Sequence, residues 1–116
     1  MDYKELNKMI DEGMVAECIR SKKKVYYISR DGRVYGAMIS GNGNVKEMSY
    51  ELSRYGYPCV KVTNKTYVIH KLVALAFIPN PNNYKTIRHV DWNKMNNNAE
   101  NLEWGSQWEE DYMEGY

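Results

Sequence analysis

A histidine and an asparagine that could take part in catalysis lie twelve residues apart in the last third of this 116-residue chain. His89 lies inside a short apolar run with Ile87 and Val90, and Asn101 follows after an asparagine-rich loop. An imidazole titrates near neutral pH and can take a proton from water, so His89 is a candidate general base. Alternating apolar and polar residues on both sides of the loop predict a hairpin, and Ser106 is a candidate N-cap for a helix after it.

The residues before this hairpin predict the elements that must position it. Residues 2–12 predict a helix, because Asp2 and Glu5 form a capping-box pattern. β-Branched and aromatic runs between residues 25 and 69 predict antiparallel strands, with residues 37–40 as a separate strand. Hairpin turns are predicted at two dipeptides, Asp31-Gly32 and Asn64-Lys65.

A short helix is predicted from His70 onward, and Pro79 and Pro81 end it. Its residues are apolar nearly all round, which predicts that it is buried. We interpret His70 as a histidine that caps this helix and orients it against the hairpin, and not as a catalytic group.

Together the patterns predict one compact α+β domain with three segments. Residues 1–24 hold the N-terminal helix and a basic turn, and residues 25–69 form a small antiparallel sheet. Residues 70–116 form a buried helix followed by a C-terminal ββα unit.

Three stretches resemble the HNH homing endonucleases of phages and mobile introns. IRHVDWNKMNNNAENLEW, at 87–104, has the order of the family's ββα-metal motif. VIHKLVALAFIPNP, at 68–81, resembles the helix and proline turn before that motif, and YISRDGRVY, at 27–35, resembles a small module often fused in front of it. The matches cover most of residues 25 to 110.

The resemblance implies hydrolysis of DNA phosphodiesters in an active member, with Mg²⁺ or Mn²⁺ as cofactor. His89 then takes the general-base position. Asn101, twelve residues on, matches the asparagine that crosses the loop to the backbone beside the histidine. We interpret Asn93, Asn96 and Asn97 as loop structure only, with amides that satisfy the turn backbone.

The chain departs from the family at the metal ligands. The residue before the histidine is usually Asp or Asn and here is Arg88, whereas the asparagine ligand of the closing helix aligns with Glu110. A guanidinium stays protonated and has no lone pair to offer. It also opposes a cation by about 4 kcal/mol per pair of unit charges at roughly 4 Å and an effective dielectric of about 20. We therefore expect a degraded site in which Arg88 pairs with Glu110; the alternative is that Glu110 and Asp91 hold the metal.

The net charge of +1 is unevenly distributed. Residues 1–70 carry +4 and residues 71–116 carry −3. Candidates for phosphate contacts lie in the first part: Arg20, Lys22, Lys23, Lys24, Arg30 and Arg33. Candidates for contact with a protein lie in the second part: Trp92 (where the family generally has glycine), Glu109, Asp111 and Tyr112. Either set can instead be ordinary solvated surface.

Three functions fit these residues. The first is an HNH-derived protein with a degraded metal site and no cofactor, which binds a macromolecule such as DNA or a host nuclease that it inhibits. The second is an active, metal-dependent HNH nickase, and the third is a DNA-binding remnant that does not cut. No apolar run reaches the length of a membrane span, and no export signal opens the chain, so we expect a cytoplasmic protein, in the host cell if a phage encodes it. The sequence sets no oligomeric state.

Overall fold

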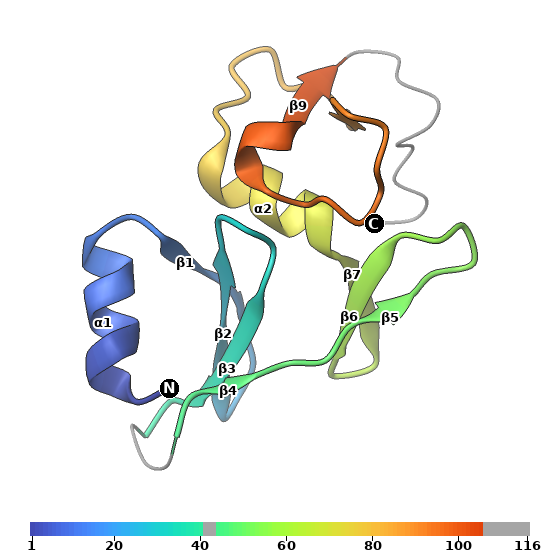
Figure 1. The fold of residues 1–116 in the computed structure, drawn as a ribbon. Helices are drawn as coiled ribbons and strands as arrows, with labels where there is room; N and C mark the ends of the chain where they lie inside the picture. Colours follow the sequence, from blue (N-terminus) through green and yellow to red (C-terminus); the bar gives the residue numbers. More distant parts are fainter. Residues whose placement is uncertain (41–43, 106–116) are drawn as a thin grey trace.

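The computed structural model describes residues 1–40 and 44–105, and within them it has the expected α+β architecture (Figure 1). Two helices, one 3-10 turn and nine strands occur in these ranges, and every strand pair is antiparallel. Neither helix combines the length and the apolar character needed to cross a bilayer. The expected helix after Ser106 lies outside the described residues, as do Glu109, Glu110, Asp111 and Tyr112.

The N-terminal helix lies against the first sheet. α1 (Tyr3–Asp11) begins as expected, because the Asp2 carboxylate accepts a hydrogen bond from the Glu5 backbone N–H at 2.8 Å. Leu6 is its buried residue and packs in a small core with Val15 and Tyr35. The sheet has the order β1-β2-β3-β4, with these bounds: β1 (Val15–Arg20), β2 (Lys24–Ser29), β3 (Val34–Met38) and β4 (Lys46–Glu47).

The separate strand expected at residues 37–40 is wrong. Val34–Met38 is one strand that pairs continuously with β2, and Ala37 lies opposite Val25. Gly36 does not break it. A Cβ there would lie 3.2 Å from the Tyr26 ring, so the glycine lets that ring approach the backbone.

The remaining strands of the expected single sheet form a second, three-stranded sheet. Its strands, in the order β5-β6-β7, are β5 (Glu51–Leu52), β6 (Pro58–Val62) and β7 (Lys65–Val68). The β6–β7 turn lies one residue earlier than expected. Thr63 and Asn64 take φ of 49° and 67°, as both central residues of a type I′ turn require, and Lys65 already pairs with Val62.

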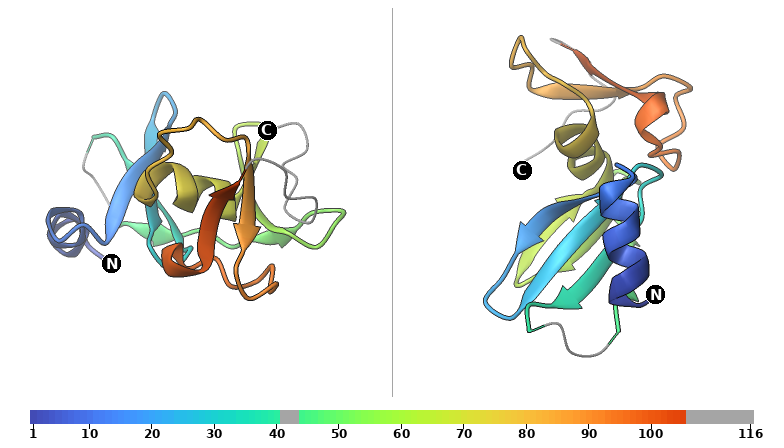
Figure 2. Two further views of the ribbon diagram at one scale, coloured as in Figure 1. Left: turned by 90° about the horizontal axis from the view of Figure 1, so that it is seen from above. Right: turned by 90° about the vertical axis from the view of Figure 1, so that its left-hand side faces the viewer.

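α2 (Ile69–Phe77) is the central element, between the two sheets and the C-terminal hairpin (Figure 2). The main core is shared by all of these parts and includes Ile28, Val34, Val60, Leu72, Val73, Ala74, Ile87 and Leu102. Two expectations for α2 are wrong. Leu75 is 62% exposed, so the helix is not buried all round, and its N-cap position is occupied by Val68 and not by His70.

The C-terminal hairpin consists of β8 (Thr86–His89) and β9 (Leu102–Gly105), with a 3-10 turn (Ala99–Asn101) leading into β9. The Trp104 indole N–H donates to the Ile78 carbonyl at 3.1 Å and fastens β9 to the end of α2. The loop between the strands, residues 90–101, is called the HNH loop below.

The β2–β3 turn packs directly on the HNH loop. A Cβ added to Gly32 would lie 3.0 Å from Asn97 Cβ and 3.2 Å from the Asn97 carbonyl oxygen. Gly32 also has φ +89°, which is unfavourable for any other residue. The turn therefore needs glycine both for its conformation and for the close approach of the loop.

We predict that Gly32→Ala lowers the free energy of unfolding by about 1–3 kcal/mol more than Gly13→Ala does. Gly13 is a matched control, because it has φ +74° but nothing within 4 Å of its added Cβ. Urea denaturation of both variants measures the difference, and equal losses would show that the turn and the loop are not in tight contact.

Candidate HNH site

His89 ends strand β8 and is buried, with 1% of its surface exposed. Its Nε2 lies 2.7 Å from the side-chain oxygen of Asn97. An amide oxygen can only accept, so Nε2 carries the hydrogen and donates it.

Two buried rings pack against His89. The His70 ring, from α2, meets it edge-on with centroids 5.1 Å apart, and the Tyr57 ring, just before β6, lies 6.3 Å away. Tyr57 and His70 are themselves 5.1 Å apart. Lys94 covers Tyr57 from the HNH loop, with Nζ 4.8 Å from the ring centroid. His70 thus orients α2 against the hairpin, as expected, but through ring packing.

Asn101 makes the loop-crossing contacts that the family resemblance implies. Its side-chain oxygen accepts from the Asp91 backbone N–H at 3.1 Å, and its amide N–H groups donate to the Asp91 carboxylate and the Asn96 carbonyl, both at 2.9 Å. Its own carbonyl accepts from the Val90 N–H at 2.8 Å. Asn101 therefore closes the loop directly after His89; a role in catalysis stays a prediction.

The Asp91 carboxylate is engaged inside the loop. It accepts from the Asn96 side chain at 2.9 Å and the Asn93 backbone N–H at 2.8 Å, besides Asn101. These three bonds, with that from Asn96 the largest cause, lower the pKa of Asp91 below its ordinary value. Asp91 is therefore ionised at neutral pH, and its oxygens are already used to hold the loop together.

Asn97 is the functional residue that sequence reasoning missed. Asn93 and Asn96 serve loop structure as expected, since the side-chain oxygen of Asn93 accepts from the Met95 N–H at 3.0 Å. Asn97 is instead buried and orients His89. The five asparagines of this loop look alike in sequence, and only the path of the backbone shows that Asn97 points inward.

Arg88 does not lie in open solvent. Its side chain is 25% exposed, and Nη2 lies 3.3 Å from Oε1 of Glu103, its cross-strand partner in the β8–β9 register. The pair proposed from sequence, with Glu110, falls outside the described residues. Glu103 was not expected as a partner, although strand register alone would have identified it.

One of the two ligand positions implied by the family resemblance, Glu110, lies outside the described residues, so only the surroundings of Arg88 and His89 can be described. Within residues 1–40 and 44–105, no three His, Cys, Asp or Glu side chains are grouped so that they can hold a metal ion. A guanidinium stands at the position that resembles the ligand before the histidine, and Nε2 of His89 is bonded to Asn97.

The six basic residues predicted to contact nucleic acid form two groups at opposite ends of β2. Lys22 and Lys23 are exposed in the β1–β2 turn with Lys24, which begins β2, and Arg20, which pairs with Glu17 at 2.8 Å. Arg30 and Arg33 flank the β2–β3 turn beside the HNH loop, because the Arg30 carbonyl accepts from the Ala99 N–H at 2.7 Å.

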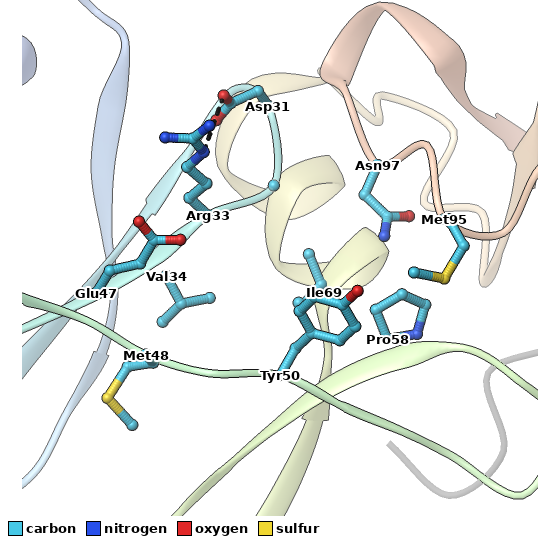
Figure 3. A pocket seen from close by; sticks show the side chains of 11 residues that line it. Asp31, Arg33, Val34, Glu47, Met48, Tyr50, Pro58, Ile69, Met95 and Asn97 are labelled. Atoms are coloured by element: carbon cyan, nitrogen blue, oxygen red, sulfur yellow. Dashed lines mark ion pairs between the residues drawn. The ribbon is translucent and has the colours of Figure 1, made fainter.

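A cavity of about 220 Å³ opens where the β2–β3 turn, the segment between β4 and β5, the start of β6 and the HNH loop face one another (Figure 3). The Asp31–Arg33 ion pair, 3.5 Å long, lies at one side and Met95 and Asn97 at the other. Asn97 therefore both lines this cavity and holds His89.

No protein-family model matches the chain. Two proteins described as uncharacterized HNH endonucleases of Acanthamoeba polyphaga mimivirus are similar to it. One is 41% identical over 83 residues, which is 68% of this chain and 24% of the relative, and the other is 39% identical over 79 residues, which is 58% and 20%. The chain thus spans about a quarter of the length of these relatives.

A solved structure of the HNH homing endonuclease I-HmuI, described as showing its DNA binding and cleavage, matches with a TM-score of 0.58 and 27% identity. The match covers 78% of this chain and 51% of I-HmuI. With the order of hairpin, histidine and loop asparagine now also seen in space, the chain belongs to the HNH homing endonuclease family.

Proposed function

We propose that this chain is an HNH-family protein of the phage or mobile-element type that binds DNA and has lost the divalent-metal site used for cleavage. HNH endonucleases generally use a divalent metal ion. The observation that carries the proposal is Arg88, which stands next to His89 and holds a permanent positive charge where the family resemblance implies a metal-binding oxygen.

The charge of Arg88 supports loss of the metal. Glu103 pairs with Arg88 across the hairpin. The guanidinium therefore already provides the positive charge that a metal ion would otherwise bring to this position. Asp91, the described carboxylate suggested as an alternative ligand, is engaged by three hydrogen bonds within the loop. Recruiting a metal to Asp91 means breaking part of the structure that closes the loop.

Retention of His89 is consistent with this proposal. A buried imidazole that bonds Asn97 and packs on two rings is needed for the core whether or not it acts as a base. A second candidate is a metal-dependent nickase in which Glu110 and Asp91 bind the metal, and the contacts of Asn101 beside His89, which are those the family resemblance implies, support it.

DNA is the partner that the family relationship favours. The structural relative I-HmuI is described by its DNA binding and cleavage. In this chain Arg30 and Arg33 adjoin the HNH loop, and Lys22, Lys23 and Lys24 form a second basic group at the other end of β2. The alternative is that the protein inhibits a host nuclease. The acidic residues after Ser106 would then contact a basic protein partner.

We predict that the protein retards duplex DNA in a salt-sensitive manner but does not nick supercoiled plasmid with Mg²⁺ or Mn²⁺. His89→Ala serves as the control for any nicking that is seen. Nicking by the wild type that disappears in this variant would contradict the loss of the metal site. No affinity for DNA, together with co-purification of a basic protein, would instead select the inhibitor.

We predict that Arg88→Asp, alone or with Glu110→Asn, raises the affinity for Mn²⁺ at least tenfold, about 1.4 kcal/mol, because it removes a repelling charge and adds a ligand. Calorimetric titration measures the affinity. Lys85→Asp is the matched control, since it makes the same charge change at an exposed residue just before β8. Equal affinities in all of these variants would mean that Arg88 does not occupy a ligand position.

A further inference from the structure

Trp92 combines an unfavourable backbone conformation with an exposed ring. Its φ is +64°, in the left-handed region, and its side chain is 65% exposed. Its backbone N–H donates to the His89 carbonyl at 3.0 Å, so the residue lies in a tight turn directly after the histidine.

This combination does not serve folding. A bulky residue in the left-handed region is disfavoured by contact of its Cβ with the backbone, and glycine takes this conformation without that strain. The exposed indole also gains little from the core. Glycine would therefore hold the turn at least as well, which points to a use for the ring outside the core.

The loop segment that carries the Trp92 ring is held in place by hydrogen bonds. Asp91, just before it, accepts hydrogen bonds from Asn93, Asn96 and Asn101, and these bonds bind the two sides of the loop together. Side chains on rigid loops lose less conformational freedom when they bind a partner.

Other exposed apolar side chains lie near Trp92 in the sequence or on a turn that contacts the HNH loop. Val90 and Met95 belong to the same loop and are exposed. Lys94 donates to the Tyr55 carbonyl at 3.0 Å, so the turn that carries the exposed Tyr55 ring touches this loop.

We propose that Trp92 is a base-contacting residue, whose indole stacks on or wedges against a base of DNA bound at the HNH loop. The inference rests on the proposed function, which puts DNA against this hairpin. Aromatic side chains stack on any of the four bases, because every base has a π face, and wedging rings distort the base stack locally. Phosphate charge is met by the basic residues of other elements, and the ring adds a contact that does not depend on charge.

Fluorescence anisotropy with a labelled 25-base-pair duplex tests this proposal on the full chain at several salt concentrations. Trp92→Ala and Trp92→Gly are expected to weaken binding about 5- to 150-fold, and Trp92→Phe to weaken it less than about threefold. The dependence of affinity on salt should stay unchanged, because no phosphate contact is lost. Leu75→Ala, which removes another exposed apolar side chain, should bind as the wild type does.

Thermal unfolding of the same variants separates binding from folding. The melting temperature of Trp92→Gly should equal that of the wild type or exceed it by up to about 4 °C, since glycine relieves the left-handed strain. Unchanged DNA affinity in Trp92→Ala, or a loss that accompanies unfolding in both variants, overturns the inference. A wild type that does not bind the duplex at all overturns the proposed function itself.

Discussion

The hydrogen bond between Asn97 and the buried imidazole of His89 joins the HNH loop to the core of this protein. The rings of Tyr57 and His70 pack around the same imidazole, so that the second sheet, helix α2 and the C-terminal hairpin meet at one residue. The β2–β3 turn adds the first sheet, because Gly32 lies against Asn97. A buried polar ring is tolerated only with a hydrogen-bond partner, and this requirement fixes where the loop runs.

The structural role of His89 changes how its presence should be interpreted. In an active HNH enzyme the histidine must act as a base beside a metal ion, but here it is also part of the core. Evolutionary loss of the metal site would leave the same histidine in place, because removing it would leave Asn97 with a lost partner and the rings with a gap. At residue 88, by contrast, the charge itself departs from the family pattern, and Glu103 pairs with it across the β8–β9 hairpin. The charge at residue 88 is therefore more informative about activity than the histidine next to it.

Much of this arrangement could be predicted from local signals in the sequence. The Asp2 cap, the Asp31-Gly32 turn and the helix before Pro79 each depend on a residue type at a fixed spacing, whereas the contacts of Asn101 were implied by the family resemblance. The errors concern choices that spacing does not determine. Residues 37–40 were expected as a separate strand, but Gly36 permits close contact with Tyr26 within one continuous strand, and the strands expected in one sheet divide between two that both contact α2.

In the candidate site, too, some features could be predicted from the sequence and others could not. The types and order of its residues were visible in the sequence, whereas their partners were not. Which loop asparagine reaches His89, and which carboxylate faces Arg88, depend on the register of β8 with β9 and on the path of the loop between them. Contacts across a sheet or a loop are set by the whole fold, so they cannot be assigned from neighbouring residues alone.

A crystal structure of the protein grown with Mn²⁺, with anomalous diffraction data, tests the central claim most directly. We expect no anomalous peak beside His89 and the Arg88 guanidinium within ion-pair distance of a carboxylate. A manganese ion bound next to His89, with Arg88 turned away from it, would contradict the loss of the metal site and identify the protein as a DNA nickase.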